Sequence, residues 1–446
     1  MNTEEFLPPR DIEAEAAVLG SVLIDPDAYY DMAEVLEADM FYRPEHRWVY
    51  EAIHALHDRS EPVDLLTVAD ELTRAGKLGE TGGTSYLIDL INNVPTSVNA
   101  EGYARIVLEK ATRRRLIQAA GQAAKFAYDE TKPLAEVTAA AEAAIMGVNA
   151  ATQRGTVLAP RRYMSDYIDA FMSDVAAGSQ TNRTIATGLT DLDRVLGGLE
   201  PSHQYLIAGR TSMGKSSMAL GIVLHAAMRQ SKRVALFSLE MSQEQISNRL
   251  IAMMTGIAVE RLKPARRHEL TSSEQTAVMN AAGQLADGGI YVDCTAGIKP
   301  SDIRARAGRL YAAHGLDMVV VDHMHIMQPT AATGKQVQDL GSIAIDLSNL
   351  YKDFNVVGVT LAQLNRGVDA RAIKRPMLSD LRESGQIEEA AYVAMFVHRE
   401  GYYDDTADPH AAEIVVAKNR DGATGTVNVF WKQELSMFKN AMRVEL

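Results

Sequence analysis

One short segment of this 446-residue sequence has the residue types and spacing of a phosphate-binding loop. Residues 209–216 read Gly-Arg-Thr-Ser-Met-Gly-Lys-Ser and fit the pattern G-x-x-x-x-G-K-[ST]. The glycines allow the backbone to curl until its N–H groups face a triphosphate. We expect Lys215 to reach the β- and γ-phosphates and the Ser216 hydroxyl to ligate Mg²⁺. The predicted nucleotide contacts are Gly209, Arg210, Thr211, Ser212, Met213, Gly214, Lys215, Ser216 and Ser217.

A phosphate-bound Mg²⁺ also needs a carboxylate, and Asp322 is the candidate. It closes the run Asp317-Met-Val-Val-Val-Asp322, which has the pattern of a buried strand with a carboxylate at its C-terminal end. Ligands of α/β sheets bind at that end of the strands. We therefore expect Asp322 to hold Mg²⁺ through water. The alternative is a strand that happens to end in aspartate.

A general base for the attacking water is expected on another strand, because His323 follows Asp322 where many P-loop ATPases have glutamate. Glu240 lies at the end of the apolar run 234–238, two residues after Ser238. The RecA-like branch of P-loop proteins places its base at the end of the strand that follows the phosphate-loop helix. Glu240 is therefore the predicted base.

Another apolar run, 356–361, is followed by the polar amide of Gln363. An amide at this strand tip can sense the γ-phosphate and transmit its loss to the following loop. His323 and His325 form an H-x-H pair that also suggests a metal site. We favour packing of the two rings in a strand or loop over metal binding.

The C-terminal two-thirds of the chain alternates short apolar runs with helical stretches. This is the pattern of an α/β fold with a buried central sheet. The strand-like runs are 205–208, 234–238, 290–292, 318–321, 356–361, 392–397 and 414–417. Two closing segments, 426–431 and 438–444, are expected to form an antiparallel hairpin at one edge. We predict a RecA-like α/β P-loop ATPase domain over residues 184–446.

The N-terminal third has helical periodicity throughout. Apolar residues recur at helical spacing within 12–24, 47–56 and 63–72, and Asp11 is suited to cap the first of these helices. An amphipathic stretch near residue 161 is too short to be stable alone and must dock on something. We predict an all-α domain at 1–150, with a globular part at 1–95 and a helical hairpin at 100–149, then a linker at 151–183 that contains an amphipathic helix at 161–177.

The net charge of −13 argues by itself against a nucleic-acid partner, because phosphate binding usually requires a basic surface. The charge is unevenly distributed, however. Residues 1–150 hold 13 Lys and Arg against 26 Asp and Glu, whereas residues 151–446 are neutral in sum. The acidity is therefore confined to the N-terminal third and does not count against anion binding by the remainder.

The cysteine content and the apolar runs indicate the cellular compartment in which the protein works. The single cysteine, Cys294, excludes an internal disulfide and a Cys-rich zinc site. No window of about 18 uninterrupted apolar residues suggests a membrane span. The acidic N-terminus also lacks the apolar core of a secretory signal. We expect a cytoplasmic protein with no membrane partner.

Motifs in a fixed order along nearly the whole chain resemble those of the DnaB-family replicative DNA helicases. Thr211 and Ser216 depart from the family, which usually has proline and threonine there, but both remain chemically competent. The segments that carry the resemblance are PPRDIEAEAAVLGSVLID, ATGLTDLDRVLGGLEPSHQYLIAGRTSMGKSSMAL, ALFSLEMSQEQISNRL, VVVDHMHIM, LAQLNR, LSDLRESGQIEEAAYVAMFVHRE and VAKNRDGATGTVNVFW.

The resemblance implies a homo-hexameric ring that encircles single-stranded DNA and translocates 5′→3′ on hydrolysis of ATP with Mg²⁺. It implies that Glu240 is the base and Gln363 the sensor. A Lys-x-Arg pair that reaches the ATP of the neighbouring subunit corresponds here to Lys418 and Arg420. An arginine in this role stabilises charge on the γ-phosphoryl group and is worth roughly 10³–10⁵ in rate. From spacing alone, Arg420 also fits a solvated charge before an Asp-Gly turn.

The segment Asp380-Leu-Arg-Glu-Ser-Gly385 resembles the loop with which the family grips successive DNA phosphates. The preceding residues 366–375 are locally basic in a neutral domain, a pattern that also fits a solvated loop. Contacts to phosphates alone would give sequence-independent and salt-sensitive affinity. The predicted DNA contacts are Arg366, Arg371, Lys374, Arg382, Glu383 and Gly385.

The resemblance also implies partners for the rest of the chain. The amphipathic helix would dock on the adjacent subunit and lock the ring. The acidic N-terminal third resembles a collar that contacts primase and, in some systems, a helicase loader. Two alternatives stay open: a RecA-like recombinase or clock-type ATPase on the same core, and an assembly protein that holds primase or a loader without productive unwinding.

Overall fold

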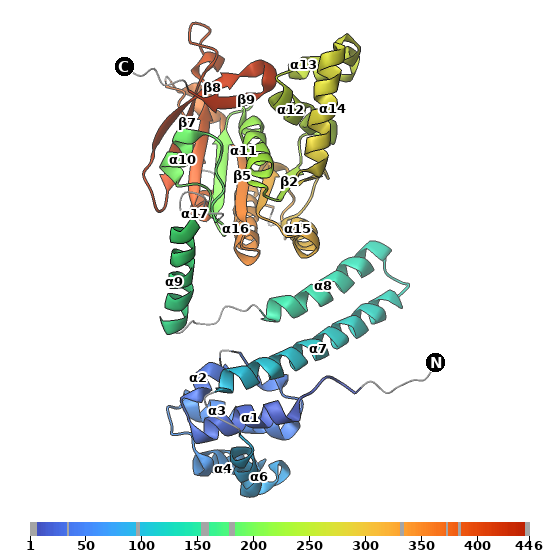
Figure 1. The fold of residues 1–446 in the computed structure, drawn as a ribbon, viewed down its shortest axis with the longest axis vertical. Helices are drawn as coiled ribbons and strands as arrows, with labels where there is room; N and C mark the ends of the chain where they lie inside the picture. Colours follow the sequence, from blue (N-terminus) through green and yellow to red (C-terminus); the bar gives the residue numbers. More distant parts are fainter. Residues whose placement is uncertain are drawn as a thin grey trace. The chain divides into compact units, whose positions relative to one another are not determined.

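The computed structural model describes residues 7–33, 35–94, 99–152, 160–177, 183–330, 334–371, 373–381 and 385–441. The chain divides into two compact units, Met1–Ala176 and Ala177–Leu446. The first unit is helical and the second is built around one large sheet, as Figure 1 shows. This arrangement of fold types confirms the predicted fold class.

The N-terminal unit begins with a bundle of short helices around an apolar core. Its helices are α1 (Ile12–Ile24), α2 (Ala28–Ala33), α3 (Pro44–Asp58), α4 (Leu65–Arg74), α5 (Leu78–Thr81) and α6 (Gly83–Asn92). The Asp11 side chain accepts a hydrogen bond from the N–H of Ala14 (3.0 Å), so the predicted cap of α1 is confirmed. At Gly20, α1 crosses α6 so closely that a Cβ atom would lie 2.2 Å from the carbonyl oxygen of Leu90.

Three longer helices follow, α7 (Ala100–Ala127), α8 (Leu134–Thr152) and α9 (Pro160–Ala177). Helices α7 and α8 form the predicted hairpin, and α7 joins the core of the bundle through buried residues of its N-terminal half, among them Ala104 and Val107. In α9 the apolar face is exposed: Tyr163, Met164, Tyr167, Ile168, Phe171, Met172 and Val175 each expose between 46% and 60% of their surface.

The second unit contains one nine-stranded sheet with the order β3-β2-β4-β5-β1-β6-β7-β8-β9. Strands β3 to β6 are parallel, and β7 to β9 continue the sheet as antiparallel strands. The strands are β1 (Gln204–Gly209), β2 (Val234–Ser238), β3 (Ile290–Asp293), β4 (Met318–Asp322), β5 (Val357–Gln363), β6 (Val393–His398), β7 (Ala411–Asn419), β8 (Gly425–Lys432) and β9 (Met437–Asn440). Each predicted strand is therefore confirmed, although β9 ends at Asn440 and residues 442–446 lie outside the described part.

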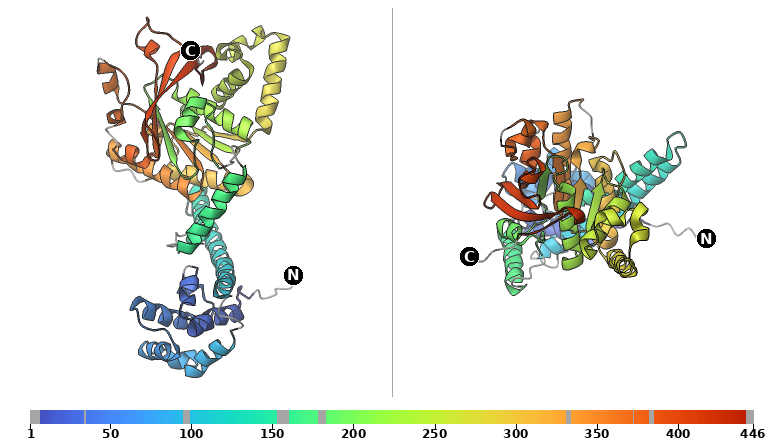
Figure 2. Two further views of the ribbon diagram at one scale, coloured as in Figure 1. Left: turned by 60° about the vertical axis from the view of Figure 1, so that its left-hand side comes forward. Right: turned by 90° about the horizontal axis from the view of Figure 1, so that it is seen from above.

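Helices cover both faces of this sheet (Figure 2). One apolar cluster packs α10 (Thr190–Leu196), α11 (Lys215–Gln230) and α12 (Gln243–Thr255) against one face. A second cluster packs α15 (Pro300–His314), α16 (Gln336–Asp353) and α17 (Gly385–Ala390) against the other. Because both faces are covered, the central strands are almost continuously apolar, which is why their runs were visible in the sequence.

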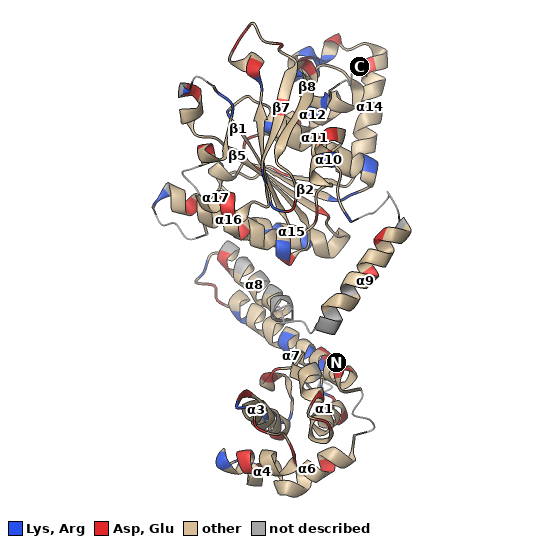
Figure 3. Cartoon of the chain, turned by 90° about the vertical axis from the view of Figure 1, so that its left-hand side faces the viewer, with Lys and Arg blue, Asp and Glu red and all other residues tan. Residues whose placement is uncertain are grey.

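The charge asymmetry of the sequence also follows the two units. Figure 3 shows acidic positions recurring along α1, α3 and α4 of the N-terminal unit. Within the described residues, no helix is both long enough and apolar enough to cross a membrane.

Candidate functional site

The phosphate loop joins β1 to α11 through a backbone with two left-handed positions. Ser212 and Gly214 have positive φ angles of 64° and 102°. A Cβ atom on Gly214 would lie 2.8 Å from the Phe438 ring and 3.4 Å from the Trp431 ring, both at the antiparallel edge of the sheet. The second glycine of the motif is thus required by its φ angle and by the aromatic side chains packed on the loop.

Lys215 and Asp322 lie close together at the C-terminal ends of β1 and β4. The Lys215 Nζ donates a hydrogen bond to the carbonyl oxygen of Arg210 (3.2 Å). Burial lowers the pKa of Lys215, and the carboxylates of Asp322 and Glu240 oppose this shift. The structure therefore brings together the lysine and both predicted carboxylates.

Asp322 has the environment of a metal-holding carboxylate. It is 4% exposed, and burial raises its pKa while a hydrogen bond from Ser216 lowers it. Within the described residues, its Oδ1 atom is buried without a hydrogen-bond partner. Buried polar atoms are normally satisfied, so this oxygen has the character of a site completed by a ligand. The pairing of Ser216 with Asp322 is suited to Mg²⁺, which prefers oxygen ligands.

Glu240 is brought beside β4 because β2 and β4 are parallel neighbours, with Ser238 opposite Asp322. Its Oε2 lies 3.6 Å from the Nε2 of His323, and its side chain is 57% exposed. Burial lowers the pKa of His323, and the carboxylates of Asp322 and Glu240 oppose this shift. The residue that replaces the usual glutamate after the β4 aspartate therefore contacts the predicted base, a relationship that the sequence analysis missed.

Arg249 of α12 is a second neighbour that the sequence analysis missed. Burial lowers its pKa, and the carboxylates of Asp322 and Glu240 oppose that shift. Arg249 lies between Ile246 and Leu250 on the buried side of α12. The sequence could have revealed Arg249 as a charged residue on an otherwise apolar face of the helix.

Gln363 reaches the phosphate loop from β5. Strands β1 and β5 are parallel with Gly209 opposite Gln363, and the Gln363 Nε2 donates to the Thr211 Oγ1 (3.1 Å). The Gln363 backbone N–H donates to the Nδ1 of His325 (3.4 Å). Burial lowers the pKa of His325 to about 4, so the ring is neutral and can accept this hydrogen bond. His325 thus packs behind the predicted sensor.

Lys418 and Arg420 lie at the other end of the sheet from the phosphate loop of the same chain. Asn419, between them, pairs with Val393 at the start of β6, and Val393 pairs with Tyr205 at the start of β1. Tyr205 is roughly 13 Å of strand from Gly209, at about 3.3 Å per residue.

Both side chains bind carbonyl oxygens at the C-terminal end of α17. The Lys418 Nζ donates to Ala391 (2.8 Å) and to Glu388, and the Arg420 Nη2 donates to Glu389 (2.8 Å). The structure therefore brings Lys418 and Arg420 together, but not with Lys215.

The predicted DNA contacts lie between β5 and β6. Arg371 forms an ion pair with Asp380, and the Lys374 Nζ lies 4.8 Å from the ring centroid of Tyr403. Gly385 is the exposed first residue of α17. Arg366 is the first residue of a short 3₁₀ helix, η6 (Arg366–Ala370), and its side chain is not among those that the structure describes. Arg382 and Glu383 also lie outside the described residues.

Arg399 contacts the phosphate loop, although the sequence analysis assigned it no role in the site. It follows β6, is 9% exposed, and its Nη1 donates to the carbonyl oxygen of Ser212 (3.3 Å). Its guanidinium carbon lies 4.8 Å from the ring centroid of Trp431. Burial lowers its pKa. Arg399 and Trp431 thus support the loop from the side opposite Gln363.

The chain matches known protein families and proteins over nearly its whole length. Residues 184–440 match the protein family described as "DnaB-like helicase C terminal domain". Residues 7–109 match the family described as "DnaB-like helicase N terminal domain". Replicative DNA helicase DnaC of Bacillus subtilis is 38% identical over 441 residues, covering 98% of this chain and 96% of the relative. Replicative DNA helicase DnaB of Geobacillus stearothermophilus is 37% identical over 442 residues, with the same two coverages.

A solved structure supports the same assignment. It is described as a DnaB-like replicative helicase and its interactions with primase, and it matches 97% of this chain and 100% of its own with a TM-score of 0.66 and 28% identity. The matches cover both units of the chain in the same order. The chain belongs to the family of DnaB-like replicative DNA helicases.

Proposed function

We propose that this chain is the subunit of a homo-hexameric ring that encircles single-stranded DNA, translocates 5′→3′ on ATP hydrolysis and unwinds duplex DNA at the replication fork. The observation that carries the proposal is the separation of the two halves of the ATP site. Lys215, Asp322 and Glu240 gather at one end of the sheet, whereas Lys418 and Arg420 lie at the other. A complete site then requires a second copy of the chain.

Within one subunit, the side chains divide the work of hydrolysis. Lys215 would bind the β- and γ-phosphates, and Ser216 and Asp322 would hold Mg²⁺, which neutralises charge on the phosphates when bound. Glu240 would accept a proton from the attacking water. Oxygen of that water bonds to the γ-phosphorus, the bond to the β–γ bridging oxygen breaks, and ADP and phosphate leave. Gln363 would report the loss of the γ-phosphate through Thr211.

Mixed rings test the shared site. A Lys215→Ala subunit retains Arg420, and an Arg420→Ala subunit retains Lys215, so mixing them recreates some complete interfaces. We expect the mixture to hydrolyse ATP faster than either variant alone. Mixing Arg420→Ala with a subunit that carries both substitutions is the matched control and restores nothing. Absence of rescue at every mixing ratio would refute action between subunits.

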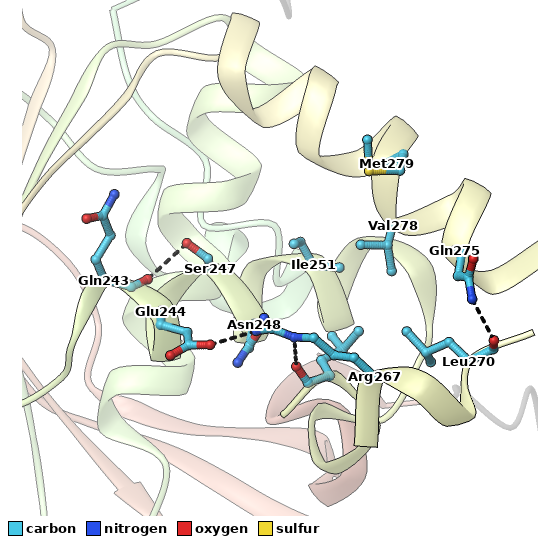
Figure 4. Close-up of a pocket in the computed structure, with 11 residues that line it drawn as sticks. Gln243, Glu244, Ser247, Asn248, Ile251, Arg267, Leu270, Gln275, Val278 and Met279 are labelled. Carbon is cyan, nitrogen blue, oxygen red and sulfur yellow. Dashed lines mark hydrogen bonds and ion pairs between the residues drawn. The ribbon is translucent and has the colours of Figure 1, made fainter. Parts of the chain in front are cut away.

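The exposed apolar face of α9 supports a second contact between neighbouring subunits, because this face also needs a partner. In the ATPase unit, α12 and α14 (Ser272–Asp287) border a groove of about 680 Å³ that is lined by both apolar and polar side chains (Figure 4). We infer that α9 of one subunit docks in this groove of the next. The lining residues are Gln243, Glu244, Ser247, Asn248, Ile251, Leu262, Arg267, Leu270, Gln275, Val278 and Met279.

Charge placed on either surface should open the ring. Phe171→Glu on α9 and Met279→Glu in the groove are each expected to lower the hexamer fraction in native mass spectrometry, because they bury an unpaired charge. Asp169→Asn, on the same helix, is the control. Retention of full hexamer by both glutamate variants would reject this docking.

Polarity and partners complete the proposal. The basic residues Arg366, Arg371, Lys374 and Arg382, with Glu383 and Gly385, would grip DNA phosphates, and the acidic N-terminal unit would bind primase or a loader in the cytoplasm. We expect ATP-dependent separation of a forked duplex that carries a 5′ single-stranded tail. Separation only from a 3′ tail would contradict the polarity, and separation without ATP would contradict the motor.

A further inference from the structure

The side chain of Arg210 turns away from the phosphate loop to which its backbone belongs. Its Nε and Nη2 donate to the two carboxylate oxygens of Asp369 at 2.6–3.1 Å, and its Nη1 donates to the carbonyl oxygen of Leu364 (3.0 Å). The Arg210 side chain is 14% exposed. The guanidinium group is therefore engaged by the segment that leaves β5.

Asp369 connects this contact to a third element. It lies in η6, and its Oδ1 also accepts a hydrogen bond from the Tyr403 hydroxyl (3.1 Å). The hydrogen bond from Arg210 lowers the pKa of Asp369, so the carboxylate is ionised. Burial and the nearby Asp369 raise the pKa of Tyr403 to about 12, so its hydroxyl remains a donor. The ammonium group of Lys374 lies over the Tyr403 ring, 4.8 Å from its centroid.

The segment from Gln363 to Asp369, which precedes Arg371 and Lys374, is thus fastened to the phosphate loop at two points. Gln363 is bonded to Thr211, and Asp369 is bonded to Arg210, the residue before Thr211. Residues between these points cannot move without moving the loop or breaking a charge-assisted, two-pronged contact. A partly exposed ion pair contributes little to stability. Its directional effect, which links the phosphate loop to the segment after β5, is the more consequential one.

We propose that Arg210, Asp369 and Tyr403 form a coupling contact, through which DNA bound to the basic residues after β5 accelerates ATP hydrolysis at the phosphate loop. Asp369 and Tyr403 act here as positioning residues and touch neither nucleotide nor DNA. The proposal rests on the proposed function, because it uses the assignment of Arg371 and Lys374 to DNA.

Steady-state ATP hydrolysis of the full-length ring, with and without a saturating poly-dT oligonucleotide, tests the coupling. For Asp369→Asn we expect kcat without DNA and KM for ATP to stay within about twofold of wild type. The stimulation by DNA should fall by at least about fivefold, while affinity for the labelled oligonucleotide is retained. Tyr403→Phe should cause a smaller fall. Asp369→Glu, which keeps the charge, should recover part of the stimulation.

The control is Asp405→Asn, an identical change at an exposed position on the loop that carries Tyr403, and it should behave as wild type. Full DNA stimulation in Asp369→Asn would overturn the coupling contact and leave the proposed function intact. Loss of basal kcat or of oligonucleotide affinity in that variant would also overturn it, since the residue would then serve the site or the DNA surface itself. Absence of DNA stimulation in the wild-type ring would overturn the coupling contact, whereas absence of ATP-dependent strand separation would refute the proposed function.

Discussion

The N-terminal unit and the ATPase unit both bury acidic and histidine side chains, but they satisfy them differently. In the N-terminal unit, Glu15 accepts hydrogen bonds from the backbone N–H groups of Tyr42 (2.7 Å) and Arg43 (3.3 Å) and pairs with His46 (2.8 Å). His46 in turn contacts the Tyr86 hydroxyl through its other ring nitrogen (2.7 Å). Each polar atom of the Glu15 and His46 side chains has a partner.

In the ATPase unit, the corresponding buried pair is incomplete. Asp322 and His323 are 4% and 8% exposed, and within the described residues the Asp322 Oδ1 and the His323 Nδ1 are buried without partners. A fully satisfied buried network specifies how helices pack, whereas an unsatisfied one is available to a ligand. Three variants can break or sharpen this comparison of the two buried clusters.

The largest effect is expected for Glu240→Gln, which removes the base but keeps the shape of the side chain. We expect kcat for ATP to fall by about 10²–10⁴-fold, with ATP binding and ring formation retained. Because Glu240 is largely exposed, the melting temperature should be unchanged. Glu200→Gln, an exposed glutamate before β1, is the control. Unchanged steady-state hydrolysis in Glu240→Gln would reject the assignment.

Glu15→Ala should show the opposite pattern. It leaves two backbone N–H groups and His46 without their acceptor, and breaking a buried pair in this way costs about 3–5 kcal/mol. Chemical denaturation of the full-length protein should show this loss in the transition of the N-terminal unit. Glu15→Gln retains one acceptor oxygen and should lose less. An unchanged denaturation midpoint of the N-terminal unit in Glu15→Ala would contradict the comparison.

Tyr86→Phe gives the smallest effect, because it removes only the hydroxyl that bonds to His46 and, at the exposed side, accepts from Arg43. We expect a loss of about 1 kcal/mol, again in the unfolding of the N-terminal unit. The kcat of the folded protein should be unaffected. A loss as large as that of Glu15→Ala would mean that the network depends on Tyr86 rather than on the carboxylate.

Much of the fold was predictable because its strands and helices are encoded by patterns of neighbouring residues. The apolar runs of β1, β2, β4 and β5 are continuous in the sequence, and their burial on both faces leaves little room for other residues. Likewise, Asp11 caps α1 through a contact three residues away. The contacts of His323 with Glu240 and of Arg210 with Asp369 were not predictable, since they join residues 83 and 159 positions apart.

By itself, the sequence determined the phosphate loop, the carboxylate that ends β4 and the resemblance to a replicative helicase. Each is written in contiguous residues whose backbone and side-chain chemistry act locally. Only the tertiary structure decided which side chains meet. The order of strands β2-β4-β5-β1-β6-β7 brings Glu240 to His323 and Gln363 to Thr211, and it sets Lys418 and Arg420 at the opposite end of the sheet from Lys215. Strand order depends on long-range packing that no single segment encodes.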